Sequence, residues 1–233
     1  MLTDSYYIFV PVKDSPETAE RALRALKGQP VTIWNDNSTP ENTERLHRVA
    51  DELSFECIDV STLTDHPSPN YLLLLRMMQQ KALENKRHVI IVESDVIVEK
   101  TTVERLLHTA QQEGIGLVAA VTTDELGRVN FPYEYARHYK PGEIETRKRL
   151  SFCCTLLSLN LLQKVDFSCL DPEKNWYDVT ISKLSLRAGL TNILRTDTPV
   201  LHFPHSSRPW KMIKYTNPIL YYWLKFRYGR DKI

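Results

Sequence analysis

Short apolar runs alternate with amphipathic stretches along the first half of the chain. The apolar runs have the length of buried strands, and they fall at residues 6–12, 31–36, 55–60, 88–94 and 116–122. Between them, apolar residues recur at helical spacing at residues 15–28, 38–53, 71–85 and 101–114. This alternation predicts a Rossmann-like α/β fold, with a mostly parallel central sheet and helices on both faces. Ligands bind beyond the carboxyl ends of the strands in such sheets.

Two of the predicted helices carry recognisable start signals. Ser15 can cap the first helix, with Pro16 in its first turn. Ser38 and Glu41 have the spacing of a capping box before the second helix.

The pattern loosens after about residue 123. Residues 125–149 are polar and aromatic without a sustained period, which is typical of loops around a site. Regular patterns then return as a strand and helix at 150–165, a helix at 175–190, and a last strand and loop at 198–207. We therefore divide the chain into an α/β domain at 1–205 and a helical tail at 206–233.

Composition narrows the class of protein. With 42% hydrophobic and 25% charged residues over 233 positions, the chain is typical of a globular protein. A net charge of +1 gives no electrostatic attraction to nucleic acid, so no nucleic-acid partner is expected. No run approaches the roughly 18 apolar residues of a spanning helix, and the first residues lack the charge and apolar core of a signal peptide.

The four cysteines are Cys57, Cys153, Cys154 and Cys169, and none forms a CxxC pair. Neither a disulfide framework nor a zinc site is expected from this spacing. Reduced thiols are typical of a cytoplasmic protein, and that is the expected location, with membrane contact only from the inner face.

Two carboxylates follow the fourth apolar run, in the segment Glu93-Ser94-Asp95. At strand spacing both acidic side chains would face the same way and repel each other. A hard divalent cation such as Mn²⁺ or Mg²⁺ relieves this repulsion and can hold a diphosphate leaving group. The alternative is a solvated strand end with two ordinary acids.

Five short motifs occur in the order found in one enzyme family. They are Pro11-Val12 after the first strand, Asn35-Asp36-Asn37-Ser38 after the second, Glu93-Ser94-Asp95 after the fourth, Tyr177-Asp178 opening a late helix, and His202 after the last strand. In this order the chain resembles the GT-A-fold glycosyltransferases, particularly the inverting family-2 type, over residues 6 to about 205. The sequence departs from the family pattern at Lys13, Asn35, Glu93 and Tyr177.

The resemblance implies an inverting transfer of a sugar from a nucleotide-diphosphate donor to a hydroxyl of a glycan or lipid-linked acceptor, in cell-surface polysaccharide biosynthesis. It implies a divalent metal on Glu93 and Asp95, with His202 as a third ligand and His205 as its competitor. Asp178 would be the general base that deprotonates the acceptor.

The same resemblance implies the nucleotide-binding residues. They comprise Pro11, Val12, Asp36, Glu93, Ser94 and Asp95. Arg76 is added because an isolated Arg on an apolar helix face suggests an anion or an ion-pair partner. Each has a simpler alternative: Asp36 is also a good turn residue, and Arg76, alone on an apolar helix face, can extend to solvent. Asp178 can equally cap its helix.

Two other functions stay open. A sugar nucleotidyltransferase would need a Gly-rich phosphate loop after the first strand, and "PVKDSPET" contains no glycine. A non-catalytic relative that binds a glycan or a partner is the other alternative, since Lys13, Asn35 and Tyr177 depart from the pattern.

The tail combines aromatic and basic residues around Pro218. Such a segment can lie at an anionic membrane surface, with aromatic rings in the interface and cations near the lipid headgroups. Packing against the catalytic domain is the alternative.

Overall fold

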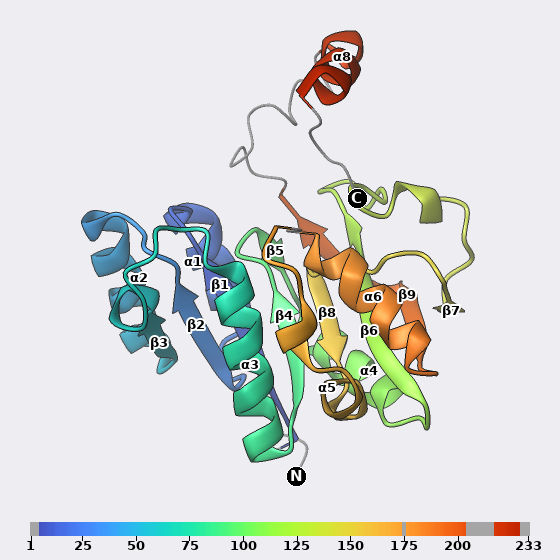
Figure 1. Ribbon diagram of the computed structural model, residues 1–233, viewed down its shortest axis with the longest axis horizontal. Helices are drawn as coiled ribbons and strands as arrows, with labels where there is room; N and C mark the ends of the chain where they lie inside the picture. Colours follow the sequence, from blue (N-terminus) through green and yellow to red (C-terminus); the bar gives the residue numbers. More distant parts are fainter. Residues whose placement is uncertain (1–4, 174–175, 204–216, 229–233) are drawn as a thin grey trace. The chain divides into compact units, whose positions relative to one another are not determined.

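The computed structural model describes residues 5–173, 176–203 and 217–228 (Figure 1). The chain divides into two compact units, Met1–Phe203 and Pro204–Ile233. The first contains a nine-stranded sheet in the order β3-β2-β1-β4-β8-β6-β9-β5, with β7 paired to β9. The strands are β1 (Tyr6–Val12), β2 (Val31–Asn35), β3 (Glu56–Asp59), β4 (His88–Val92), β5 (Val96–Ile97), β6 (Ile115–Thr123), β7 (Glu143–Glu145), β8 (Cys154–Leu157) and β9 (Thr191–His202).

Helices cover both faces of this sheet, as the sequence predicted (Figure 1). The α-helices are α1 (Pro16–Ala25), α2 (Pro40–Leu53), α3 (Tyr71–Asn85), α4 (Lys100–Ala110), α5 (Leu159–Lys164), α6 (Tyr177–Arg187) and α8 (Pro218–Tyr228). Short 3₁₀ turns are η2 (Val60–Thr62), η3 (Glu134–Ala136) and η4 (Phe167–Cys169). One apolar core joins α1, α2 and α4 to the sheet, and the other joins α3, α5 and α6 to the opposite face.

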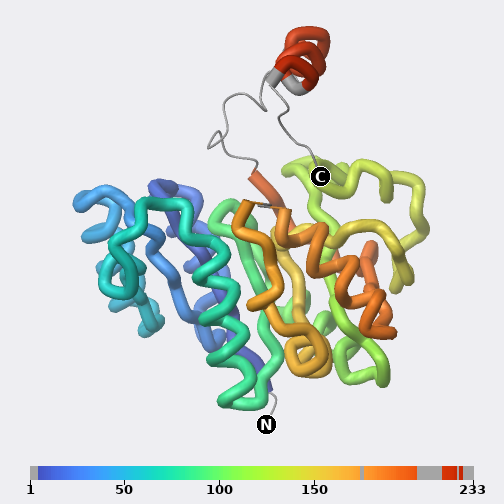
Figure 2. The backbone as a smooth tube through the Cα atoms, in the orientation of Figure 1, coloured from blue at the N-terminus to red at the C-terminus, as the bar shows by residue number. Residues whose placement is uncertain are grey.

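The sheet is mixed at its centre. Strands β1, β2, β3 and β4 are parallel, but β8 runs antiparallel between β4 and β6. Strand β6 then pairs in parallel with β9. The backbone trace in Figure 2 shows how β8 joins the first half of the chain to the second. This inversion brings the segment before β8 against the end of β4.

Strand β9 is longer than the predicted final strand, since it begins at Thr191 rather than near residue 198. Its first half was missed because buried polar residues interrupt the apolar pattern. Asn192 is fully buried, accepts a hydrogen bond from Ser185 Oγ at 2.7 Å and donates to Ser182 O at 2.9 Å. The short strand β7, which pairs with β9, lies in the segment predicted as loops.

The predicted helix caps were partly wrong. Ser15 occupies the N-cap of α1 without a side-chain cap, and its hydroxyl lies 3.0 Å from Ser94 Oγ instead. Helix α2 is capped by Thr39 rather than Ser38, because Pro40 takes the first helical position. The Ser38 hydroxyl accepts the Asp14 N–H at 3.0 Å, which joins the turns after β1 and β2.

In the second unit, the structure describes residues 217–228, and these hold helix α8. Asn217 caps its start, where its Oδ1 accepts the Leu220 N–H at 3.0 Å. None of the helices in the described ranges combines the length and apolar character that a bilayer span requires.

Candidate functional site

The acidic segment Glu93-Ser94-Asp95 forms a tight turn between β4 and β5. The predicted strand at 88–94 ends at Val92, and the Val96 N–H closes the turn on Glu93 O at 3.1 Å. The two acids therefore come together through a turn, and the strand spacing inferred from the sequence does not apply. The apolar residues that follow form β5, which pairs with the end of β9.

Cys153 lies beside Glu93 because β8 pairs with β4. The Glu93 N–H donates to Cys153 O at 3.0 Å, and the Cys153 thiol donates to Glu93 Oε2 at 3.2 Å. Burial and the charge of Glu93 raise the pKa of Cys153 well above its ordinary value, so the sulfur keeps its proton. Burial, then the charge of Asp95, raises the pKa of Glu93 to about 7.

His202 completes this cluster from the end of β9. Its Nδ1 lies 2.8 Å from Phe131 O, a carbonyl that can only accept, so Nδ1 carries a proton. Its Nε2 lies 3.5 Å from Asp95 Oδ2. Burial by itself lowers the pKa of His202, but Asp95 and Glu93 outweigh that effect and hold the pKa above its usual value.

This cluster fits a divalent cation. One ligand atom each from Glu93, Cys153 and His202 lies within 4.8 Å of the other two, and Asp95 Oδ2 lies 3.5 Å from Nε2 of the same imidazole. The neutral imidazole tautomer fixed by Phe131 would leave Nε2 as a lone-pair donor, which is the usual arrangement of a histidine ligand. Carboxylates and one imidazole suit Mn²⁺ or Mg²⁺ better than a thiol does, so Cys153 fits a role in orienting Glu93. His205, the alternative ligand, lies outside the described residues.

Asp178 lies in the first turn of α6 and belongs to the same electrostatic neighbourhood. Its charge contributes to the raised pKa values of Glu93 and Tyr71. Its Oδ1 accepts the N–H of the next residue at 2.8 Å, and its Oδ2 lies 3.5 Å from Arg149 Nη1. Helix α6 has no side-chain cap at its N-cap residue, Trp176.

Aromatic rings surround Arg149. Its guanidinium carbon lies 5.8 Å from the centre of the Phe131 ring and 6.0 Å from that of Trp176. Trp176 is partly exposed, whereas Tyr177 is buried. The Tyr177 ring stacks on that of Tyr71, with 6.3 Å between the ring centres. One of the two aromatic residues beside Asp178 therefore fills the core, and the other borders the site.

Tyr71 contributes a buried hydroxyl that sequence reasoning missed. Among the described residues this hydroxyl has no hydrogen-bond partner. Burial, and then the charges of Glu93 and Asp178, raise the pKa of Tyr71 well above its ordinary value. A buried hydroxyl without a partner is costly, so it marks a place where a bound molecule would supply the missing contact.

Asp36 organises the loop before α3. Its carboxylate accepts hydrogen bonds from Ser68 Oγ at 2.8 Å, Asn70 N at 2.9 Å and Asn70 Nδ2 at 2.8 Å. Pro11 and Val12 are the last residues of β1, and Val12 O accepts the Asp36 N–H at 2.8 Å. These residues and Ser94 thus meet at the carboxyl edge of β1, β2 and β4.

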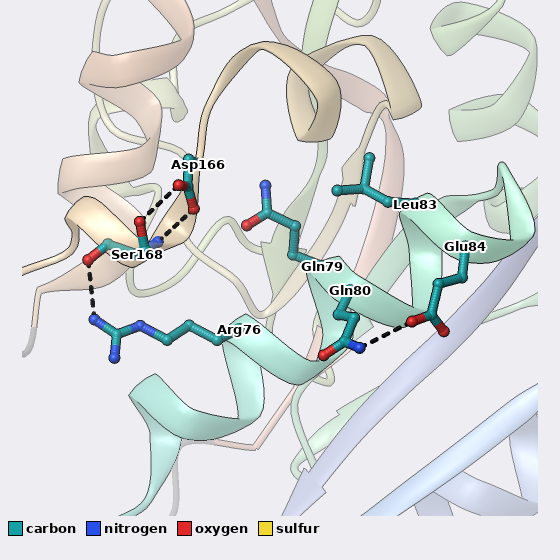
Figure 3. A pocket seen from close by; sticks show the side chains of 7 residues that line it. All are labelled: Arg76, Gln79, Gln80, Leu83, Glu84, Asp166 and Ser168. Atoms are coloured by element: carbon teal, nitrogen blue, oxygen red, sulfur yellow. Dashed lines mark hydrogen bonds between the residues drawn. The ribbon is translucent and has the colours of Figure 1, made fainter.

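Arg76 lies apart from this edge. Its guanidinium donates to three backbone carbonyls of the segment around η4, at Phe167, Ser168 and Leu170. It also lines a pocket of about 320 Å³ that is formed by residues of α3 together with Asp166 and Ser168 (Figure 3). The hydrogen bonds found for Arg76 hold the segment before α6 against α3, and none joins it to the acidic cluster.

Sequence reasoning missed three residues of this neighbourhood. Cys153 read as part of an apolar strand, and Tyr71 read as the start of an apolar helix. Arg149 ends a basic stretch in the segment expected to form loops, and that charge was the only signal for it.

Neither a protein-family model nor a functionally curated protein matches this sequence. Several solved structures match its fold. The mannosyltransferase PcManGT from Pyrobaculum calidifontis, in complex with GDP-Man and Mn²⁺, has a TM-score of 0.60 and 13% identity over 95% of this chain and 64% of its own.

Two further structures agree. S. aureus TarS, residues 1–349, has a TM-score of 0.61 and 15% identity over 85% of this chain and 60% of its own. GalNAc-T7 with UDP, GalNAc and Mn²⁺ has a TM-score of 0.61 and 12% identity over 86% of this chain and 44% of its own. The chain therefore has the GT-A fold, as its motifs predicted, and it spans less than two thirds of the length of each of these structures.

Proposed function

We propose that this chain transfers a sugar from a nucleotide-diphosphate donor to a hydroxyl group of an acceptor, with inversion at the anomeric carbon. The observation that carries the proposal is the cluster of Glu93, Asp95 and His202 at the carboxyl edge of the sheet. Like charges are gathered there in a buried site, where a cation would stabilise them. Two structures of the same fold contain Mn²⁺ with GDP-Man or UDP.

Each residue has a defined task in this reaction. Glu93, Asp95 and His202 would hold the cation, which would neutralise charge on the leaving diphosphate. Asp36 supports the nucleoside end of the site through the loop of Ser68 and Asn70. Tyr71 offers its hydroxyl to the bound donor or acceptor.

Asp178 acts as the general base. The acceptor hydroxyl gives its proton to the Asp178 carboxylate while its oxygen attacks the anomeric carbon. The bond from that carbon to the phosphate oxygen breaks in the same step, and the nucleoside diphosphate leaves. A single displacement of this kind inverts the anomeric configuration. Arg149, 3.5 Å from Asp178, holds the base in position, and the Trp176 ring borders the space for the acceptor.

A thermal-shift series with nucleoside diphosphates tests the donor site. One nucleobase should raise the melting temperature, and only with Mn²⁺ or Mg²⁺ present, because ligands stabilise the state that they bind. In the Asp95→Asn variant, calorimetry should show that the metal ion no longer increases the affinity for the nucleoside diphosphate. If no nucleoside diphosphate binds with any divalent ion, the proposal is wrong. Binding without turnover of any nucleotide sugar would favour the non-catalytic alternative.

We also propose that helix α8 contacts a membrane surface, which would bring the site to a lipid-linked acceptor. Four of its apolar side chains recur at helical spacing: Ile219 is 85% exposed, Tyr222 58%, Trp223 55% and Phe226 90%. An exposed aromatic stripe of this kind suits the interface of a bilayer. The exposed Arg227 adds a cation near the stripe.

Co-sedimentation with anionic vesicles tests this contact. The full chain should bind at low salt and less at high salt, because ions screen the basic residues. Replacing Ile219 and Phe226 by Ser should abolish binding while leaving nucleotide affinity unchanged. If the full chain stays in the supernatant, or the double variant still binds, the membrane contact is excluded.

A further inference from the structure

A second group of metal-ligating side chains lies far from the acidic turn in sequence. It comprises His47 from α2 and Cys57 and Asp59 from β3. One ligand atom from each residue lies within 4.8 Å of the other two, and all three residues are partly buried. The spacing of cysteines along the chain gives no hint of this group, because its members come from a helix and a strand.

We propose that His47, Cys57 and Asp59 form a second metal site, which takes a borderline divalent ion such as Zn²⁺. Imidazole, thiolate and carboxylate are the three side-chain ligands that Zn²⁺ uses in proteins. The mixture of sulfur and nitrogen distinguishes this group from the carboxylate-rich cluster at Glu93 and Asp95, which suits a harder ion.

The backbone fixes the two strand ligands on one side. Cys57 and Asp59 are two residues apart on β3, so their side chains share a face of the sheet. Cys57 packs against the core beneath α1, α2 and α4. Helix α2 covers the same face and supplies His47, whose Nε2 lies 2.8 Å from Asp59 Oδ2.

Neighbouring side chains orient these ligands. The amide of Asn35 donates to Asp59 Oδ1 at 2.7 Å and to Thr43 Oγ1 at 3.0 Å. This leaves Asp59 Oδ2 directed at His47. Hydrogen bonds from an outer shell to a ligating carboxylate are a regular feature of metal sites, because they hold the ligand in the binding orientation.

The charge of a second carboxylate also acts on the thiol. Asp51 follows His47 by one helical turn on α2, and its charge acts on Cys57 together with that of Asp59. Burial, then these charges, raises the pKa of Cys57 to about 12. A bound cation would reverse this balance by stabilising the thiolate, and the thiol proton would pass to solvent. A water molecule would complete a tetrahedral set.

Such an ion would connect α2 to the edge of the sheet. Strand β3 is a terminal strand, and Asp59 pairs in register with Asn35, the first residue of the turn that contains Asp36. The site would therefore stiffen the turn beside the proposed nucleoside site without touching the acidic cluster.

Cobalt spectroscopy tests the site, because Co²⁺ replaces Zn²⁺ and reports on its ligands. The full chain with Cys153→Ser is the starting protein, so that the thiol at the acidic cluster is absent. We expect one equivalent of Co²⁺ to give a thiolate charge-transfer band and the visible bands of a tetrahedral ion. Zn²⁺ should displace the cobalt and raise the melting temperature.

Variants of the starting protein assign the ligands. Cys57→Ser should remove the charge-transfer band, and His47→Gln, at a partly exposed position, should weaken Co²⁺ binding tenfold or more. His108→Gln, at an exposed position on α4, is the matched control. It should change neither the charge-transfer band nor the affinity for Co²⁺. Circular dichroism checks that each variant is folded. The proposal is overturned if the starting protein gives no band, if the band survives Cys57→Ser through the exposed Cys169, or if His47→Gln binds like the control.

Discussion

Strand β9 passes through two groups of buried charge that differ in how well they are balanced. Around Arg195, the guanidinium donates to Glu143 Oε1 at 2.7 Å, to Thr109 Oγ1 at 2.7 Å and to Asp197 Oδ2 at 2.8 Å. Around His202, two acids share one imidazole, and Asp95 Oδ2 lies 3.5 Å from its Nε2. In the Arg195 group a permanent positive charge is paired with acidic side chains. In the His202 group two acidic side chains lie near each other and repel.

This difference distinguishes a structural cluster from the cluster that we propose to bind a ligand. The Arg195 group joins α4, β7 and β9, and its polar groups are paired within the protein. The Glu93 group raises the pKa of its own carboxyl, which means that the folded chain pays a cost to keep two acids there. We infer that a ligand offsets this cost in one group and that no ligand is needed in the other.

The largest expected effect is on turnover. Asp178→Asn keeps an oxygen that can accept the Val179 N–H but cannot take the acceptor proton. The rate of sugar transfer should fall by roughly 10²–10⁴-fold, the range for loss of general base catalysis. This rate is measured with the donor that the thermal-shift series identifies. Donor affinity and melting temperature should stay as in the parent. A folded variant that transfers sugar at the parent rate would reduce Asp178 to a structural residue.

A substitution in the Arg195 group should change the stability of the fold rather than turnover. Arg195→Met removes the buried cation and its hydrogen bonds to Glu143 and Asp197, so the free energy of unfolding should fall by about 2 kcal/mol, as expected when hydrogen bonds to charged groups are lost. Urea denaturation measures this loss. In the folded fraction, metal-dependent nucleotide affinity should be unchanged. Equal stability of variant and parent would mean that the Arg195 group contributes nothing net.

A substitution in the Glu93 group should change the free energy of unfolding in the opposite direction. Glu93→Gln removes one of two repelling charges, so the free energy of unfolding without metal should rise by about 1 kcal/mol at pH 8. Metal-dependent nucleotide binding should be lost in the same protein. The comparison between the two groups fails if this variant is destabilised as strongly as Arg195→Met.

Tyr71→Phe should give the smallest change in stability. Removing a buried hydroxyl that has no partner among the described residues should raise the free energy of unfolding, by up to about 1 kcal/mol. Steady-state kinetics should show a lower kcat/KM, because the hydroxyl would contact bound substrate. A loss of stability with normal kinetics would instead assign Tyr71 to packing.

The sequence predicted most of the fold because its strands are continuous apolar runs with helices of regular period between them. The predicted runs at 6–12 and 31–36 correspond to β1 and β2 almost residue for residue. Prediction failed where buried polar groups satisfy one another. Asn192 of β9, for example, forms hydrogen bonds with Ser182 and Ser185 of α6. Such pairing depends on tertiary contacts, which the pattern along one segment does not contain.

The candidate site was predicted only at the ends of strands. Glu93 and Asp95 interrupt an apolar run, so their chemistry stands out in the sequence. Cys153 and Tyr71 have apolar neighbours, and their importance depends on the inversion of β8 and the start of α3. Asp36 was expected to meet a nucleoside directly, and the structure gives it three hydrogen bonds to Ser68 and Asn70.

The inverted strand β8 also sets the order in which the site can be assembled during synthesis. The strands β1 to β4 and helices α1 to α3 all lie in the first part of the chain, which is synthesised first. Glu93 and Asp95 are then already made, but Cys153 and His202 are not. Pairing of β8 with β4 must also offset the entropy of closing the loop between them. The acids are therefore made well before their partners, and the cluster that we propose to bind a cation is complete only when β9 docks.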